Sequence, residues 1–309
     1  MIWLLFVFLI VAGIAAYPFV REMMRKPMDA SARANAPGEF ATLSQGVTHY
    51  RWFGGSRGPI AVCVHGLTTP SFVWEGIAEG LVKQGFRVLT YDLYGRGYSD
   101  RPKGPQTREF FLQQLDDVLD RQGIKADITL LGYSMGGAIV TTFTSRSPER
   151  LRRLILLAPA GMGHELGRTA RIVKERPLLG TWLMYASYPK QHRAGCEAER
   201  GLSSSVPQIV EQQLNEQGYQ GWIGSVLSSL RGILDEVLEQ DHRKLTREDV
   251  PVLAIWGEDD DVIPIAAMGQ MAKWDRTAHH EVIDGAGHGL AYTHTPQVLA
   301  AIRDDLRAS

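Results

Sequence analysis

The chain has 309 residues, of which 44% are apolar and 22% charged, and it suits one large α/β domain or two small ones. The formal net charge of -1 provides no overall field that attracts nucleic acid, and there is no basic, aromatic-rich patch. Two cysteines, Cys63 and Cys196, are too few for a disulfide framework, and no Cys/His spacing indicates a metal site.

Residues 2–20 form an apolar run without a charged side chain, IWLLFVFLIVAGIAAYPFV. As a helix that rises about 1.5 Å per residue, this run nearly spans a hydrocarbon core of about 30 Å. No Lys or Arg precedes it, whereas Arg21, Arg25 and Lys26 follow it, unlike the charge pattern of a signal peptide. We predict a single-pass membrane anchor at residues 1–20, with the rest of the chain on the cytoplasmic side. Cleavage of this segment, which would leave a secreted or periplasmic protein, is the alternative.

Residues 21–46 are small, polar and interrupted by Pro and Gly, and we predict a linker there. The segments after the linker alternate between buried strands and amphipathic helices. Strands are expected in VTHYRWFGG, PIAVCVHG, RVLTYD, DITLLG, LRRLILLAPAG, VPVLAIWG and AHHEVIDGAG. Helices are expected in SFVWEGIAEGLVKQG, TREFFLQQLDDVLDRQG, MGGAIVTTFTSRSP and TPQVLAAIRDDL. This alternation predicts an α/β fold with a mostly parallel central sheet flanked by helices.

Residues 161–249 break the alternation, because they are mainly helical and contain no clear core strand. They are too long for an ordinary connection, so we predict a helical insertion between two parts of the core, 47–160 and 250–309. An apolar insertion beside the carboxyl ends of the strands is well placed to cap a binding crevice. The alternative is a structural excursion without a role in substrate binding.

One short stretch, ITLLGYSMGGAIVTTF at residues 128–143, places Ser134 between glycines where a strand becomes a helix. Gly132 and Gly136 complete a G-x-S-x-G pattern, and their small size permits a sharp, strained turn that exposes the serine. A serine hydroxyl becomes a nucleophile when a base, a group that orients the base, and donors for an oxyanion surround it. We predict that Ser134 is that nucleophile; the alternative is a serine that caps the next helix.

The predicted general base is His288, which lies in the compact loop DGAGHGLAY after the last strand. The glycines of this loop allow the imidazole to approach the edge of the sheet. His279 and His280, at the start of the preceding strand, are expected to be structural or solvent-facing. His65, in VHGLTT, is expected to brace its own loop.

The predicted acid follows the strand VPVLAIWG, in the run EDDDVIP. A serine and histidine pair needs one carboxylate that holds the imidazole tautomer and stabilises the imidazolium. Asp260, three residues after Gly257, fits this role, and Asp259 is the main competitor. The backbone N–H groups of Leu67 and Met135 are the expected oxyanion donors, and losing one such donor costs roughly 3 to 4 kcal/mol of barrier. This chemistry needs no metal or organic cofactor.

These segments in this order resemble the α/β-hydrolase superfamily. The similarity is carried by VHGLTT, YDLYGRGYSD, LLGYSMGGAI, LILLAPAG, IWGEDDDVIP and GAGHG, and it covers residues 47–309. It implies that residues 161–249 are the family's mobile cap and that Asp92 has a structural role. A serine at the turn between strand and helix argues against the haloalkane dehalogenases and epoxide hydrolases of this fold, which carry an aspartate there. The anchor and LLAPAGM look like the membrane-anchored monoacylglycerol lipase and carboxylesterase branch.

The predicted function is hydrolysis of a small-molecule carboxylic ester with an apolar acyl group, through Ser134, His288 and Asp260. One alternative is hydrolysis of a C–C bond in a meta-cleavage-type diketo acid, whose carboxylate would need a cation such as Arg193 or Arg200 of the cap. A second alternative is an inactive, membrane-tethered binding module.

Overall fold

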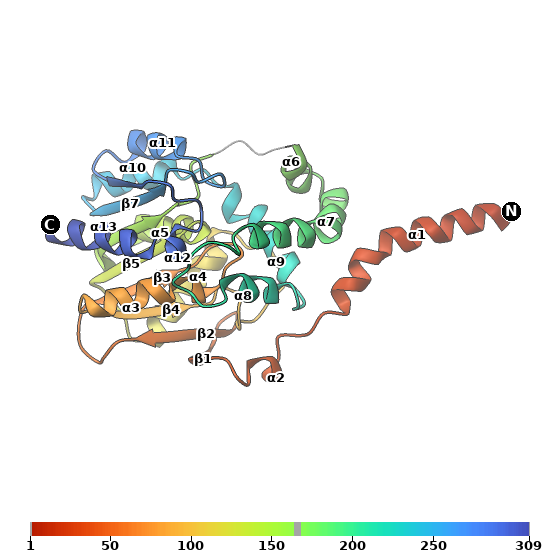
Figure 1. Cartoon of the computed structure of the whole chain (residues 1–309), viewed down its shortest axis with the longest axis horizontal. Helices are drawn as coiled ribbons and strands as arrows, with labels where there is room; N and C mark the ends of the chain where they lie inside the picture. The colour runs from red at the N-terminus through yellow and green to blue at the C-terminus, as the bar shows by residue number, and fades with distance from the viewer. Residues whose placement is uncertain (1, 164–167, 309) are drawn as a thin grey trace.

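The computed structural model describes residues 2–163 and 168–308, and at its centre lies an eight-stranded sheet (Figure 1). Its strands are β1 (Glu39–Leu43), β2 (Gly46–Phe53), β3 (Ile60–Val64), β4 (Arg87–Tyr91), β5 (Ile128–Tyr133), β6 (Leu151–Leu157), β7 (Val252–Gly257) and β8 (His279–Ile283). Across the sheet they follow the order β1-β2-β4-β3-β5-β6-β7-β8. β2 pairs antiparallel with β1 and β4, and the other pairs are parallel, which confirms the predicted sheet.

Helices cover both faces of this sheet and form two separate apolar cores. One face carries α4 (Arg108–Arg121), α5 (Met135–Arg146), α10 (Glu239–Arg247) and α11 (Ala266–Trp274). The other face carries α3 (Glu75–Lys83), α12 (Leu290–Thr293) and α13 (Thr295–Ala308). The strands between them are buried on both sides, which explains why β5 and β7 read as continuous apolar runs.

Local sequence signals fix both ends of α4. The hydroxyl of Thr107 accepts a hydrogen bond from the Phe110 N–H and caps the start of α4. Gly123, just after α4, has a φ of 69°, a left-handed conformation that glycine adopts without strain. The helix therefore ends where its glycine stop was expected. The sequence pattern did not reveal α11, which follows the acidic loop after β7.

The predicted linker at residues 21–46 is wrong for residues 39–43, because β1 is the edge strand of the sheet. Ala41 is the one residue of β1 that is buried, so the strand lacks the apolar alternation that sequence analysis depends on. The segment before β1 includes α2 (Ala30–Arg33). Arg33 Nε donates to the carbonyl of Tyr98 at 2.9 Å, which fixes this segment to the core.

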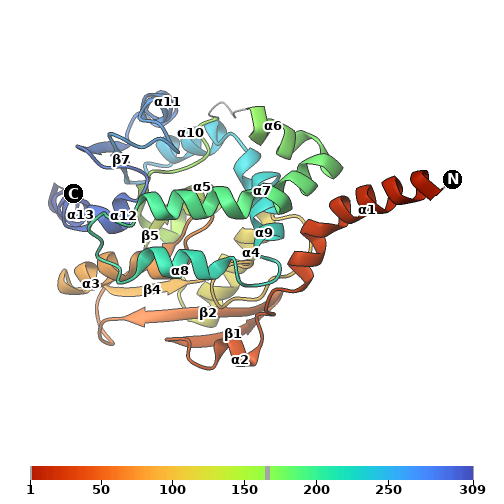
Figure 2. The same ribbon diagram turned by 45° about the vertical axis from the view of Figure 1, so that its right-hand side comes forward.

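The insertion between β6 and β7 is helical, as predicted, and lies above the carboxyl end of the sheet (Figure 2). It contains α6 (Arg168–Glu175), α7 (Pro177–Ala198), α8 (Ile209–Glu216) and α9 (Trp222–Leu230), followed by α10. α10 was expected in the cap, but it packs against α5 and α11 and is therefore part of the core. The cap has an apolar cluster of its own around Trp222, and Leu67 of the core packs against it.

The N-terminal helix α1 (Ile2–Met23) projects from the body of the molecule (Figure 1). The mean hydropathy of its most apolar 18-residue stretch is 2.4, and 6% of that stretch is buried within the structure. Within the described residues it is the single helix that is long and apolar enough to cross a membrane, and both membrane spans and signal sequences have these properties. Residue 1 of the predicted anchor lies outside the described residues.

Candidate active site

Ser134 occupies a strained turn between β5 and α5. Its φ of 54° and ψ of -118° lie in a region that non-glycine residues rarely adopt. The Ser134 carbonyl accepts hydrogen bonds from the N–H groups of Gly137 at 2.9 Å and Ala160 at 3.0 Å, and these bonds hold the turn. The Ser134 side chain makes no capping hydrogen bond to α5, so the interpretation as a helix-capping serine is wrong.

The two glycines of the pentapeptide are required by close packing. A methyl group on Gly136 would lie 2.6 Å from the carbonyl oxygen of His65 and even closer to that of Val64. A methyl group on Gly132 would lie 2.6 Å from the carbonyl oxygen of Gly136. Contacts of this length with backbone atoms cannot be relieved by moving a side chain. Gly136 therefore allows the start of α5 to lie against the end of β3, and Gly132 allows it to lie against the end of β5.

The structure brings Ser134, His288 and Asp260 into one hydrogen-bonded chain. His288 Nε2 lies 3.0 Å from Ser134 Oγ, and His288 Nδ1 lies 2.8 Å from Asp260 Oδ2. The Asp260 side chain is fully buried, and its Oδ1 accepts hydrogen bonds from the N–H groups of Val262 and Ile263, both at 2.8 Å. Both oxygens of the buried carboxylate thus have hydrogen-bond partners, as the burial of a polar group demands. His288 Nδ1 then carries its proton toward Asp260, and Nε2 is free to accept one from Ser134.

Asp259, the competing acid, does not take part in this chain. Its side chain is exposed, whereas that of Asp260 is buried and faces the imidazole. On the other side of His288, the Tyr133 hydroxyl donates to the His288 carbonyl at 2.9 Å, and the two rings lie 5.3 Å apart. Tyr133 directly precedes the serine, so this bond ties the histidine loop to the turn that presents Ser134.

The loop after β3 lies against the serine turn. A methyl group on Gly66 would come within 3.2 Å of Ser134 Cβ. His65 Nδ1 lies 2.8 Å from the Gly66 carbonyl oxygen, and His65 Nε2 accepts a hydrogen bond from the Leu93 N–H at 2.9 Å. Burial lowers the pKa of His65 to about 4, so the neutral ring donates through Nδ1. In a trans peptide the N–H points opposite to the carbonyl, and the Leu67 N–H is therefore directed away from the His65 ring.

Arg96 holds the neighbouring peptide of the same loop. Its Nε donates to the Leu67 carbonyl at 2.9 Å. Its terminal nitrogens donate to Gln106 Oε1 at 2.5 Å, and to Ser229 Oγ at 2.8 Å and the Ser225 carbonyl at 3.2 Å in the cap helix α9. The side chain is completely buried, and burial lowers its pKa to about 9, which leaves it charged at neutral pH. One guanidinium thus connects the loop beside Ser134 to the cap.

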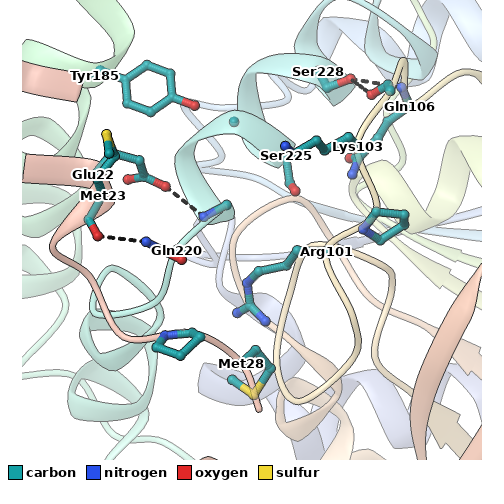
Figure 3. Close-up of a pocket in the computed structure, with 15 residues that line it drawn as sticks. Glu22, Met23, Met28, Arg101, Lys103, Gln106, Tyr185, Gln220, Ser225 and Ser228 are labelled. Carbon is teal, nitrogen blue, oxygen red and sulfur yellow. Dashed lines mark hydrogen bonds between the residues drawn. The ribbon is translucent and has the colours of Figure 1, made fainter. Parts of the chain in front are cut away.

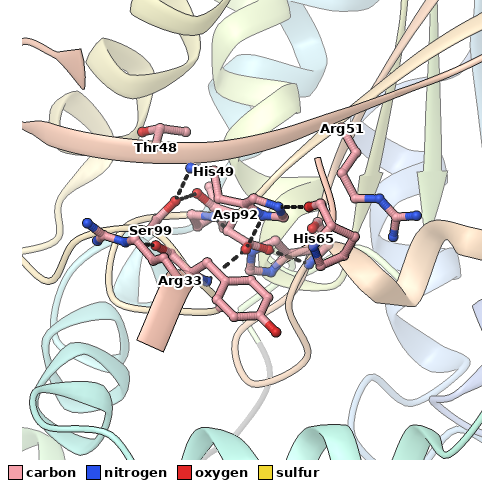
Figure 4. Close-up of polar contacts among 12 residues, drawn as sticks. Arg33, Thr48, His49, Arg51, His65, Asp92 and Ser99 are labelled. Carbon is pink, nitrogen blue, oxygen red and sulfur yellow. Dashed lines mark hydrogen bonds and ion pairs between the residues drawn. The ribbon is translucent and has the colours of Figure 1, made fainter. Parts of the chain in front are cut away.

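Asp92 is buried and structural, as the resemblance implied (Figure 4). Its carboxylate lies 2.7 Å from His49 Nδ1 and accepts hydrogen bonds from the N–H groups of Ser71 and Tyr98, both at 2.9 Å. Burial disfavours the charged form of both side chains. The nearby Asp92 carboxylate nevertheless raises the pKa of His49, and His49 in turn helps to hold the pKa of Asp92 well below its usual range. This pair fixes the loop that carries Arg96.

The remaining candidate residues lie away from the serine. His279 lies 3.1 Å from Asp305 and is half-exposed, and His280 Nδ1 accepts a hydrogen bond from the Trp256 indole at 3.1 Å. Both therefore have the structural or solvent-facing positions that were expected. Arg193 and Arg200 are exposed residues of the cap, and Arg200 forms ion pairs with Glu197 and Glu211. No group of three or more metal-binding side chains occurs among residues 2–163 and 168–308.

The main residue that sequence analysis missed is Arg96. It stands in the quoted motif DLYGRGYS, where a charged side chain follows a buried strand and lies between two glycines. That position is a weak signal, because its hydrogen-bond partners come from α9, far along the chain. His49 was missed for a similar reason, since nothing in its own strand predicts a buried carboxylate opposite it.

Comparisons with known proteins agree with the fold. The sequence model of the family described as "alpha/beta hydrolase fold" matches residues 59–295. A 2-hydroxymuconate semialdehyde hydrolase from Pseudomonas sp. (strain CF600) is 25% identical over 242 residues, which cover 75% of this chain and 80% of that protein. A non-heme chloroperoxidase from Kitasatospora aureofaciens is 25% identical over 255 residues, which cover 76% of this chain and 86% of that protein.

Among solved structures, an esterase from Exiguobacterium antarcticum superposes with a TM-score of 0.73. The match covers 87% of this chain and 99% of the esterase, with 21% sequence identity. At that identity the likeness establishes the fold.

The Asp92 and His49 pair predicts a pH dependence of stability. Because the pKa of His49 is raised in the folded state, the pair stabilises fully below the unfolded value of about 6.5 and less as the pH rises through the folded value. We expect Asp92→Asn to lower the free energy of unfolding by about 3 kcal/mol or more at pH 6. The variant should also lose the decrease in stability between pH 6 and pH 8. Urea unfolding measures both effects, with the exposed Asp284→Asn as control. An unchanged pH slope in Asp92→Asn would contradict this account.

Proposed function

The chain belongs to the α/β-hydrolase fold family, and we propose that it is a serine hydrolase that cleaves carboxylic esters through an acyl-enzyme. The observation that carries this proposal is the hydrogen-bonded chain from Ser134 through His288 to the buried Asp260. A serine with a base at hydrogen-bond distance and a fixed orienting carboxylate is suited to nucleophilic attack on a carbonyl carbon.

The proposed reaction begins when Ser134 Oγ attacks the ester carbonyl and His288 Nε2 takes the hydroxyl proton. Asp260 stabilises the imidazolium through Nδ1–H. The tetrahedral oxyanion accepts hydrogen bonds from the N–H groups of Leu67 and Met135, the latter at the N-terminus of α5. His288 then protonates the leaving alcohol as the C–O bond breaks. Water, deprotonated by His288, attacks the acyl-enzyme, and its proton returns to Ser134 as the acid leaves.

An apolar acyl group is the proposed part of the substrate that faces the cap. Leu67, beside the serine turn, packs against the cap cluster that contains Met184, Trp222 and Val226. Apolar surface of this kind favours a hydrocarbon chain over a charged group. Esters of graded acyl-chain length, with monoacylglycerols and a thioester included, would define the preferred substrate.

The second candidate is hydrolysis of a C–C bond, which the similarity to 2-hydroxymuconate semialdehyde hydrolase favours. A diketo acid substrate carries a carboxylate and needs a cation that faces the crevice. Arg193 and Arg200 are exposed, and Arg200 is already paired with Glu197 and Glu211. The donors of Arg96 are already bound to carbonyl, amide and hydroxyl oxygens. Ester hydrolysis is therefore the better-supported proposal. Activity on a dienoic diketo acid that exceeds ester activity would reverse this order.

We also propose that α1 crosses a membrane and that the hydrolase domain lies on the cytoplasmic side. The apolar stretch of α1 is exposed on nearly all sides, and Arg21, Arg25 and Lys26 follow it. A secreted or periplasmic enzyme that has lost the segment as a signal peptide is the alternative. A membrane-tethered module without activity is the less favoured possibility, because it gives no reason for the strained, hydrogen-bonded serine.

The first prediction concerns the nucleophile. Ser134→Ala should abolish hydrolysis of p-nitrophenyl esters and labelling by a fluorophosphonate, because no other hydroxyl occupies the position next to His288 Nε2 in the described structure. Ser71→Ala is a suitable control, since Ser71 is also a buried serine but interacts with Asp92 through its backbone. Full labelling of Ser134→Ala would contradict the assignment.

The second prediction separates the two acids. Asp260→Asn should lower kcat by about four orders of magnitude, because an amide favours the wrong imidazole tautomer. Asp259→Asn should change kcat by less than about twofold, since the Asp259 side chain is exposed. Steady-state kinetics on a soluble ester measures both variants. Equal losses in the two variants would show that Asp260 is not the orienting acid.

The third prediction concerns Arg96, which we treat as a positioning residue. Arg96→Lys keeps the charge but cannot reach Leu67, Gln106 and Ser229 together, so the peptide between Leu67 and Thr68 should lose its fixed orientation. The adjacent peptide, which carries the Leu67 N–H, should then be held less rigidly. We expect kcat to fall about 10-fold to 100-fold while KM changes little. Arg87→Lys is the matched control, because Arg87 is partly buried and lies over the Trp52 ring. A rise in KM with unchanged kcat would assign Arg96 to substrate binding instead.

A further inference from the structure

The C-terminal end of α1 is hydrogen-bonded to the cap (Figure 3). Glu22 Oε1 accepts from the Gly221 N–H at 2.6 Å. Just after the helix, the Lys26 N–H donates to the Gly218 carbonyl at 3.0 Å, and the Gln220 N–H donates to the Lys26 carbonyl at 2.8 Å. These bonds join α1 to the segment between α8 and α9. The cap, rather than the sheet, is therefore the part of the enzyme that α1 holds.

The first half of α7 lies beside the last turns of α1. A groove of about 420 Å³ separates the two helices, and its walls include Ile14 and Tyr17 of α1 and Trp182 and Tyr185 of α7. At about 1.5 Å per residue, Ile14 lies roughly 9 Å along the helix from Val20, the last residue of the apolar run. Where α1 crosses a bilayer, Trp182 therefore lies at the depth of the interfacial region, which tryptophan and tyrosine favour.

The neighbouring end of the cap exposes apolar and basic side chains together. Leu178 is 89% exposed, Leu179 54% and Ile172 39%. Arg171 and Arg176 are exposed beside them. We call these five residues the cap-tip surface. In both views the helices that carry it, α6 and the start of α7, lie on the same side of the molecule as α1 (Figures 1 and 2).

The charge of this region suits an anionic partner. Lys174 forms an ion pair with Asp235, so these two side chains neutralise each other. Glu175 is the exposed acid between Arg171 and Arg176, so these three described side chains together carry one positive charge. Arg21, at the end of the groove between α1 and α7, adds a second. Basic residues beside exposed apolar ones are the pattern by which helices bind an anionic bilayer surface.

We propose that the cap-tip surface is a second membrane contact, which lies in the interface of the bilayer that α1 crosses and binds anionic phospholipid. This inference rests on the proposed membrane crossing of α1. The inner faces of the same two helices contribute Val173 and Met184 to the apolar cluster that reaches Leu67. Lipid on the outer face and the apolar cluster on the inner face are thus separated by one layer of helices. In this proposal an ester dissolved in the bilayer passes this layer on its way to Ser134.

A probe at the cap-tip surface tests this contact in the full-length protein. Leu178→Cys is labelled with an environment-sensitive fluorophore, and the protein is reconstituted into vesicles of phosphatidylcholine with phosphatidylglycerol. Cys63 and Cys196 are both buried, so the label goes to the introduced thiol. Val282→Cys is the control, because Val282 is 39% exposed on β8 of the core. Lipids with a doxyl group on the acyl chain should quench the probe at position 178 and not at 282.

The possible results of this experiment distinguish a failure of the proposed membrane contact from a failure of the proposed anchor. In one outcome the protein floats with the vesicles, but iodide rather than doxyl lipid quenches the probe at position 178. That result would overturn the membrane contact and leave the proposed anchor intact. Protein that does not float with vesicles would overturn both. Arg171→Glu with Arg176→Glu should reduce quenching by at least half in anionic vesicles and have little effect in pure phosphatidylcholine. Equal quenching with and without these changes would show that anionic lipid is not the partner.

A kinetic comparison gives a second readout. Leu178→Asp with Leu179→Asp should lower kcat/KM about tenfold for a monoester dispersed in vesicles. The same variant should leave the hydrolysis of p-nitrophenyl acetate in solution unchanged, because neither residue contacts the serine turn. A loss of both activities would mean that the cap had misfolded, and unchanged activity on both substrates would contradict the proposed route.

Discussion

The geometry around Ser134 depends on one short loop whose two peptide units are fixed by buried side chains. His65 holds the Gly66 carbonyl and Arg96 holds the Leu67 carbonyl. Because peptides are planar, holding a carbonyl also sets the direction of the N–H on the other side of the bond. A donor that must meet an oxyanion gains most from being fixed before the reaction, since no energy is then needed to reorient it. The buried histidine fixes in this way the peptide that carries the Leu67 N–H, and the buried arginine fixes the next peptide along the loop.

These two side chains depend in turn on the loop after β4. The Leu93 N–H sets the tautomer of His65, and Asp92 holds the same loop through its bonds to His49, Ser71 and Tyr98. Burying a guanidinium without a carboxylate is costly, and Arg96 is tolerated because neutral oxygens satisfy its donors. Some of these oxygens belong to α9 of the cap. A displacement of α9 would therefore loosen the peptide between Leu67 and Thr68, so the cap is physically coupled to the loop beside Ser134.

Predictions from the sequence were correct where the signal lies in residues that are neighbours along the chain. Buried strands read as apolar runs, glycines marked the turn at Ser134, and Asp260 and His288 occupied loops that follow strands in the expected order. It failed where the signal lies in a partner distant in the chain. β1 contains one buried residue, and its place in the sheet depends on pairing with β2. Arg96 looks like a loop residue until α9 is placed over it. α10 was assigned to the cap because a helical pattern does not show which layer it packs against.

Strain at Ser134 supports the view that this turn serves chemistry. A non-glycine residue in such a conformation costs on the order of 1 to 3 kcal/mol, and a turn that merely connects β5 to α5 has no need of it. Packing and hydrogen bonds around the turn offset this strain energy. α5 is buried from Met135 to Ser145, and the Ser134 carbonyl accepts two backbone hydrogen bonds. A capping serine would give the helix a hydrogen bond in return, but here the hydroxyl turns to His288 instead. The fold thus accepts a loss of stability that places the Ser134 hydroxyl beside the His288 imidazole. This arrangement is suited to acyl transfer.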